Sequence, residues 1–377
     1  MIENSRIALH RLFALSLLVS ATGCSMSKLA VSTQADVMQQ ASPVIEHQTD
    51  YEFARVAIPG TLMQVEGLLR VAPEDERLLL LGTRGFASYA YGFVEDEMER
   101  AELGGDLEQA DAARARARGL YLKAKGLGMK LLAGAAEGLA EAAARDPDQL
   151  KRFVTAEFTD PEAAPALFWT GYAWGSAINV SRDDVALVAD LSLARALVER
   201  SVELDEKYYN AAGHVFLGVA DASRGESIGG NPERGRQHFE RALALTGRRA
   251  MIVQLNFAQF YATQTQNRDL FVALLKEVLE TPVPADSPLA LPNTVARRRA
   301  ERLMAQVDTL FLPPPEDAAP AAPEEPAGAP TPPAGEPAPG DSTPVVPEGP
   351  EPKQPPPAKS PPVKPPPAKA PAAAGQG

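Results

Sequence analysis

Apolar residues in the central part of the chain recur every three or four positions and do not alternate with polar ones. Two clear stripes with this spacing are Leu62, Val65, Leu68 and Leu69 and, further along, Leu193, Leu197 and Leu204. A helix turns once in about 3.6 residues, so this spacing places apolar side chains on one helical face. Residues 44–312 are therefore predicted to form an all-α body, which prolines and glycines divide into helices of about 12–25 residues.

The clearest internal repeat runs from Leu255 to Pro282. Its apolar positions follow the tetratricopeptide (TPR) spacing on two successive helices: Phe257, Ala258 and Tyr261, then Leu270, Leu274 and Val278. Three further segments carry small and apolar residues at the second-helix positions: Gly235, Phe239, Ala242 and Leu243; Ala194, Val198, Ser201 and Val202; Thr61, Val65, Leu68 and Leu69. Small residues are expected where two helices of a hairpin approach closely.

These repeats predict three or four TPR-like hairpins, stacked as a solenoid or bundle. Residues 289–311, which include Arg297, Arg298 and Arg299, fit a terminal capping helix with a polar outer face. The alternative is an irregular bundle of amphipathic helices whose spacing coincides with the TPR pattern.

The first 24 residues have the layout of a bacterial lipoprotein signal. Arg6 and Arg11 precede a short apolar run, which ends in Ser20-Ala-Thr-Gly-Cys24. The run is too short to span a bilayer as a helix. Residues 1–23 are predicted to be a signal peptide and Cys24 the lipidated first residue, followed by a linker over 24–43. Cleavage by the ordinary signal peptidase, with Cys24 incidental, is the alternative.

Proline is concentrated at the other end of the chain. Of 35 prolines, 24 follow Leu312, and that segment contains no aromatic residue. A segment with so little to bury is expected to be disordered, with stretches of polyproline II. Residues 313–377 are thus predicted to be a tether, acidic near the body and basic at its tip. It either contacts the cell wall or is a solvated linker without a partner.

Charge and residue usage exclude several classes of function. The net charge is −12 and no basic stripe is present, so nucleic acid is not an expected partner. Cys24 is the single cysteine, which excludes a disulfide framework and a thiolate zinc site. His47, His214 and His238 stand outside any hydrolase or metalloprotease motif. No enzyme activity, cofactor or metal is predicted.

Six strings together resemble one family of envelope lipoproteins. They are Ser88-Tyr-Ala-Tyr-Gly-Phe-Val-Glu-Asp96, Trp169-x-x-x-x-Trp174-Gly-x-x-Ile-Asn179, Gly229-Gly-Asn-Pro-Glu233, His238-Phe-Glu240, Asp269-Leu-Phe271 and Leu291-x-Asn293-x-x-Ala296-x-x-Arg299-Ala300. In this order they resemble the T component associated with TRAP transporters (TatT), built on cryptic TPR hairpins. The likeness covers about residues 50–312, and the proline-rich tail departs from it.

The resemblance implies an accessory role in transport. Members of the family are expected to form trimers, to associate with the solute-binding protein of a TRAP transporter and to assist uptake of a hydrophobic or organic-acid ligand. The lipid on Cys24 would then hold the body at a membrane, and Ser25, where an aspartate would signal retention, suggests the outer one. The rival interpretation is a TPR lipoprotein that organises cell-wall or outer-membrane assembly, with the tail as a wall-spanning tether.

The candidate binding residues are aromatic. Trp169 and Trp174 are the only tryptophans in the chain, and Tyr172 lies between them. Aromatic side chains anchor partners or line ligand channels, but they also fill hairpin cores. The candidates for partner or ligand binding are Trp169, Tyr172, Trp174, Asn179, Tyr89 and Tyr91. Asn179 is also interpreted more simply as the entry to the next helix, with Ser181 or Asp183 as its cap.

Two other patterns have structural interpretations. Glu95, Glu99 and Glu102 share a helical face and are expected to be solvated and balanced by nearby arginines, rather than to hold a cation. The glycine-rich segment before Pro232 lacks the lysine of a phosphate-binding loop. Asn231 as a helix cap with Pro232 in the first turn accounts for it.

Overall fold

A computed structural model describes residues 26–226 and 229–312, and in these residues the fold is entirely helical, as predicted. Residues 26–41 form a helix, although the sequence predicted a linker there. The other α-helices are α2 (Pro43–Glu46), α3 (Tyr51–Val71), α4 (Glu76–Tyr89), α5 (Glu95–Gly104), α6 (Leu107–Ala135), α7 (Leu139–Arg145), α8 (Pro147–Glu157), α9 (Ala164–Asn179), α10 (Val185–Ala189), α11 (Leu191–Leu204), α12 (Tyr208–Ala222), α13 (Pro232–Thr246), α14 (Met251–Asn256), α15 (Arg268–Glu280), α16 (Ala290–Ala305) and α17 (Val307–Leu310). The predicted signal peptide, Cys24 and the proline-rich tail lie outside the described residues.

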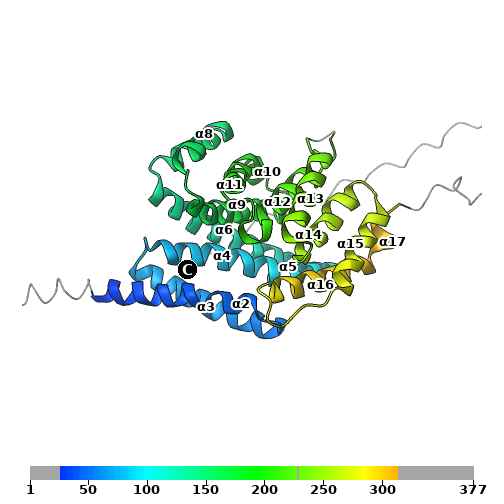
Figure 1. Ribbon diagram of the computed structural model, residues 1–377, viewed down its shortest axis with the longest axis horizontal. Coiled ribbons are helices and arrows are strands. Elements are labelled where there is room, and N and C mark those ends of the chain that lie inside the picture. The colour runs from blue at the N-terminus through cyan, green and yellow to red at the C-terminus, as the bar shows by residue number, and fades with distance from the viewer. Residues whose placement is uncertain (1–25, 227–228, 313–377) are drawn as a thin grey trace, which may run out of the picture. The chain divides into compact units, whose positions relative to one another are not determined.

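Helices that follow one another in the chain pack against each other (Figure 1). The predicted hairpins correspond to the pairs α9 with α11, α12 with α13, and α14 with α15. Near the amino end, α3 packs on α4, and the long α6 packs on both α4 and α9. The TPR-like stacking predicted from the repeats is therefore confirmed.

The ends of the helices follow the local chemistry of the chain. Asn231 accepts a hydrogen bond from the Arg234 amide at 2.9 Å, and Pro232 occupies the first turn of α13, as predicted. The cap of α10 is Asp184, whose side chain accepts from the Leu187 amide at 3.0 Å. The prediction of Ser181 or Asp183 at this position was wrong, because the helix begins one residue later than expected.

Small residues allow the paired helices to approach closely. A methyl group added at Gly171 of α9 would stand 2.7 Å from the Ala194 carbonyl oxygen of α11. At Gly235 of α13 it would stand 2.9 Å from the Gly218 carbonyl oxygen of α12. Contacts this short leave no room for a side chain, so glycine sets the spacing of both hairpins.

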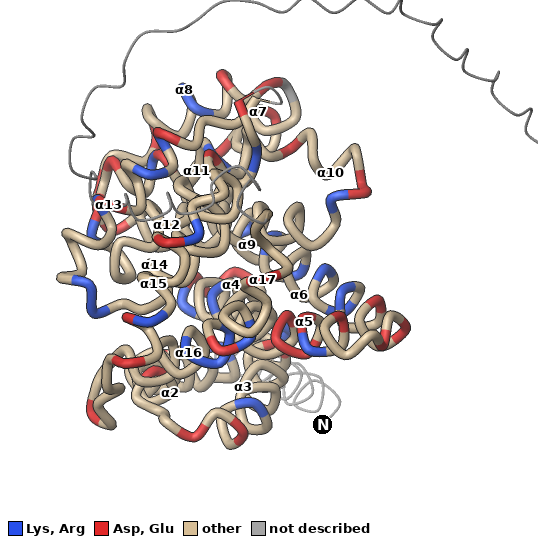
Figure 2. The backbone as a smooth tube through the Cα atoms, turned by 90° about the vertical axis from the view of Figure 1, so that its right-hand side faces the viewer, with Lys and Arg blue, Asp and Glu red and all other residues tan. Residues whose placement is uncertain are grey.

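Two large apolar clusters hold the helices together. The first joins α3, α4, α6, α9 and α11, and the second joins α12 to α16. A smaller cluster fastens the helix over residues 26–41, through Val31 and Ala35, to Leu78 of α4. Acidic and basic residues are interspersed along the helices (Figure 2).

Two helical turns are widened into π-helix, one at Ala90–Val94 between α4 and α5 and one at Phe257–Ala262 after α14. An extra residue in a helical turn shifts the register of the side chains that follow, and such turns are frequent at functional sites. Residues from both turns line the cavity described next.

Candidate functional site

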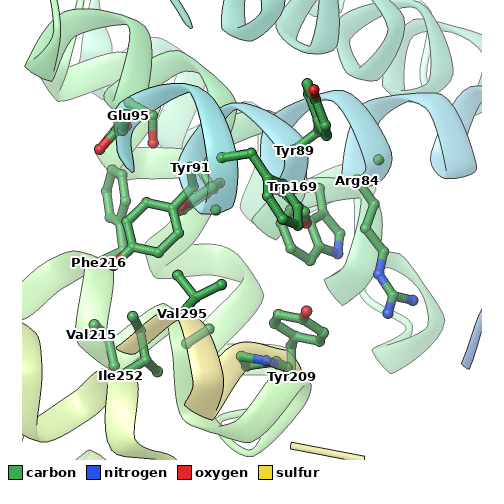
Figure 3. A pocket seen from close by; sticks show the side chains of 18 of the residues that line it. Arg84, Tyr89, Tyr91, Glu95, Trp169, Tyr209, Val215, Phe216, Ile252 and Val295 are labelled. Carbon is green, nitrogen blue, oxygen red and sulfur yellow. The ribbon is translucent and has the colours of Figure 1, made fainter. Parts of the chain in front are cut away.

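A cavity of about 1340 Å³ lies among α2, α3, α4, α5, α9, α12, α14 and α16. Its wall includes aliphatic and aromatic side chains such as Val215, Phe216, Ile252 and Val295 (Figure 3). Binding cavities for small ligands are usually about 300–1,000 Å³ and mostly apolar. This space is large enough for an extended apolar molecule.

Aromatic residues of α9 and α12 pack together along one part of the wall. The ring centroid of Trp169 lies 5.0 Å from that of Phe168 and 4.8 Å from that of Tyr209. The Trp169 indole Nε1 donates a hydrogen bond to the Tyr208 hydroxyl at 2.9 Å. With its polar atom bonded, the indole is fixed in position and presents an apolar surface.

The structure brings most of the sequence candidates together at the cavity. The candidates that line it are Tyr89, Tyr91, Trp169, Tyr172 and Asn179. Trp174 does not line it, although both tryptophans belong to the first apolar cluster and are similarly buried, Trp169 at 3% and Trp174 at 4% exposed. The Trp174 indole Nε1 donates to Asp190 at 3.1 Å, and the Lys125 ammonium lies 3.5 Å from the ring centroid. The two tryptophans therefore occupy different environments, although a role in binding remains a prediction for each.

Glu95 is buried and Glu99 is partly buried, with its side chain 23% exposed, in an ionic cluster, so the prediction that both are solvated is wrong. Arg299 of α16 is 4% exposed at its side chain and donates from Nη2 to Glu95 at 2.8 Å and from Nε to Glu99 at 3.1 Å. Arg302 donates to Glu99 and Asp96, each at 2.6 Å. Of the three predicted glutamates, only Glu102 pairs with an arginine at the surface.

Arg299 thus departs from the expected polar outer face of the capping helix. The expected partners of these glutamates were arginines close to them in the sequence, whereas Arg299 is separated from Glu99 by 200 residues. No local signal could have paired them. The guanidinium also lies 4.2 Å from the centroid of the Tyr91 ring, so the cluster forms part of the cavity wall.

Protonation within this cluster follows from burial and charge pairing. Burial raises the pKa of Glu95, and Arg299 offsets this only in part. For Glu99, burial also acts to raise the pKa, but Arg299 and Arg302 outweigh it, so the pKa lies below its ordinary value. The Tyr121 hydroxyl donates to Glu95, and burial raises the pKa of that tyrosine.

His214 and His238 form a pair between α12 and α13. Their Nδ1 atoms are 3.0 Å apart, which requires one ring to donate and the other to accept. Burial and the neighbouring His214 lower the pKa of His238 to about 4, and burial also lowers the pKa of His214. No sequence motif links the two histidines, because they lie on different helices and 24 residues apart. In the described part of the chain, no group of three or more His, Cys, Asp or Glu residues is arranged to hold a metal ion.

The helices over residues 26–226 and 229–312 include none that is long and apolar enough to cross a membrane. The predicted anchor, Cys24, precedes the first described residue and stays a prediction.

Comparison with known proteins gives two similarities. An uncharacterised protein of Treponema pallidum (strain Nichols) is 24% identical over 319 residues, which cover 80% of this chain and 97% of that protein. The family described as TRAP transporter T-component matches residues 47–311, which contain the hairpins, the ionic cluster and most of the cavity wall, whereas α2 with Glu46 precedes the matched segment. The chain belongs to the TRAP transporter T-component family.

Proposed function

We propose that this protein is an accessory envelope component of a TRAP-type uptake system, which receives the apolar part of a ligand in its cavity and docks the transporter's solute-binding protein. A lipid on Cys24 holds the body at the membrane, and the protein acts by binding rather than by catalysis. The observation that carries this proposal is the cavity of about 1340 Å³, lined by aromatic and aliphatic side chains, most of which belong to the segment that matches the family.

The apolar wall supplies the driving force for binding. Removing apolar surface from water contributes about 25 cal/mol per Å². Phe216, Val215 and Ile252 present such surface, and Trp169 and Tyr209 extend it (Figure 3). A ligand with an alkyl or aromatic body is therefore favoured over a small, fully polar solute.

Binding in the cavity is expected to be reported by one tryptophan and not by the other. Dodecanol added to the Trp174→Phe variant should change the emission of Trp169, which lines the cavity. In the Trp169→Phe variant, the emission of Trp174 should stay constant, because that indole does not line the cavity. A fluorescence titration measures both, with calorimetry as the independent measure of binding. A response from Trp174 alone, or no heat of binding, would contradict the proposal.

The outer surface supports a role in protein contact. Phe53, Val56 and Met63 lie on the face of α3 turned away from the core and are 61%, 68% and 68% exposed. Exposed apolar side chains that share one helical face are typical of surfaces that contact other proteins. The homo-oligomer implied by the family resemblance belongs to this proposal as well.

The partner is tested with the purified full-length chain and the TRAP solute-binding protein encoded beside its gene. We expect the two to elute together in size-exclusion chromatography at micromolar concentration. A solute-binding protein from an unrelated transporter serves as the control and should elute separately. If the solute-binding protein encoded beside the gene elutes separately, both with and without dodecanol, the docking part of the proposal is contradicted. The ligand-binding part of the proposal is not affected by that result.

A further inference from the structure

An ion pair stands in the cavity wall on the side away from the Glu95 cluster. Arg84 of α4 donates from Nη2 to Glu46, the last residue of α2. The two side chains are only 27% and 20% exposed, and both residues line the cavity. Figure 3 shows Arg84 beside Trp169 and Tyr209, with Tyr91 and Glu95 on the other side.

The surroundings of Arg84 are aromatic. Its guanidinium carbon lies 5.1 Å from the Tyr209 ring centroid and 6.0 Å from that of Trp169. Rings screen a cation less than water does, so a carboxylate that reaches Arg84 here is bound more strongly than at the surface. Burial raises the pKa of Tyr209, and the negative charge of the Glu46 carboxylate raises it further.

The backbone that presents Tyr209 is strained. Tyr209, Asn210 and Ala211 have φ values of 46°, 58° and 57°, so three successive residues other than glycine adopt the left-handed conformation. This conformation is unfavourable for residues that carry a Cβ atom, although less so for asparagine. Strain of this kind persists where the surrounding structure holds it, and it gathers at ligand clamps. The strained turn directs Tyr209 toward Arg84 and Glu46.

The helix that supplies Glu46 is weakly held. α2 has four residues, none of them fully buried: Ile45 packs partly buried against the first apolar cluster, and the Ser42 side chain makes no capping hydrogen bond. Few buried contacts give a segment a low free energy of local opening. Glu46 can therefore leave Arg84 at a smaller cost than a residue from a long, packed helix.

Arg299, which is buried in another part of the wall, is not available in this way. It contacts Glu95 and Glu99 together, and both belong to α5, which continues directly from the π-helical turn after α4. A ligand would have to displace two carboxylates that cannot withdraw with a mobile segment.

We propose that Arg84 binds the carboxylate of an amphipathic organic acid and that Glu46 occupies this position while the cavity is empty. The ligand's carboxylate replaces that of Glu46, and its apolar body extends along Trp169 and Tyr209 into the cavity. This inference rests on the proposed function, since it assigns the polar end of the ligand in the same cavity. Glu46 then acts as an internal competitor that lowers the apparent affinity of the cavity for the acid.

The test compares dodecanoate with dodecanol, which has the same chain and no charge, on the full-length protein. Glu46→Gln is expected to increase the affinity for dodecanoate about tenfold. This is the gain expected if Glu46 leaves Arg84 free in about a tenth of the unliganded molecules. Arg84→Met should reduce the affinity for dodecanoate to that for dodecanol. Dodecanol binding should be the same in all variants, which also shows that they are folded. Glu52→Gln, at an exposed glutamate of α3 paired with Arg55, is the matched control and should change neither affinity.

The outcomes separate the two proposals. If both probes bind but dodecanoate affinity is unchanged by Glu46→Gln and by Arg84→Met, the assignment of Arg84 and Glu46 is overturned and the proposed cavity function stands. If Arg84→Met unexpectedly fails to fold, the double variant E46Q/R84M, which removes both charges together, gives the same comparison. If neither probe binds to any variant, the cavity function fails, and this inference fails with it.

Discussion

Replacing Arg299 with methionine is expected to lower the free energy of unfolding by about 3–5 kcal/mol. The guanidinium is buried and contacts both Glu95 and Glu99. Its removal leaves Glu95 charged and without a cation in an apolar environment, whereas Glu99 keeps Arg302. Urea denaturation followed by circular dichroism measures the loss.

The same variant should show a characteristic dependence on pH. Without Arg299, the pKa of Glu95 in the folded protein rises further above its value in the unfolded chain, so the penalty is present at neutral pH. It diminishes as the pH falls, because a protonated Glu95 carries no charge to bury. The control is Arg241→Ala, which breaks the exposed pair with Glu206 and should cost much less. A loss equal to that of the control, or one independent of pH, would show that the buried cluster contributes little.

Replacing Gly171 with alanine is expected to lower the free energy of unfolding by about 2 kcal/mol, because overpacking a tight contact costs about 1–3 kcal/mol. The new methyl group would meet the backbone oxygen of Ala194, as well as a side-chain atom of Val198 at 2.7 Å. A backbone atom cannot turn aside as a flexible side chain can, so α9 and α11 would have to separate.

Gly119→Ala in α6 is the matched control for this contact. A methyl group there has no neighbour within 4 Å, and the residue is exposed. Alanine favours the helix over glycine, so this variant should gain about 0.5–1 kcal/mol. Opposite signs for the two glycines, measured by the same denaturation, are the expected result. A gain at both positions would mean that the α9 and α11 contact adapts without cost.

Local patterns accounted for much of the fold. The spacing of apolar residues predicted the helices, and small residues such as Gly235 marked where paired helices touch. Asn231 and Pro232 identified the start of α13, because a cap is a local hydrogen bond within one turn of helix. The same reasoning misplaced the cap of α10 by one residue, since Asp183 and Asp184 are chemically equivalent and only the packing of the turn distinguishes them.

The candidate site was predicted in part. An aromatic helix around Trp169 and Tyr172 was found by residue type, and both residues line the cavity. Residue type could not show which of Trp169 and Trp174 lines the cavity. The two residues are five positions apart on α9, so their side chains point to different sides of the helix and meet different neighbours. Arg84 and Glu46 had no signal of their own: an isolated charge in an amphipathic helix normally faces water.

The sequence by itself determined that this protein is built of helical hairpins, where some of their helices begin, and which family it resembles. These features depend on contacts within a few helical turns. Such contacts require apolar and small residues at regular spacing along the sequence. Only the tertiary structure decided that Glu95 and Arg299 are buried together, that Glu46 faces Arg84, and that the helices enclose a cavity. Those relations depend on the angles at which successive hairpins stack, and small differences in each angle accumulate over the 200 residues that separate Arg299 from Glu99.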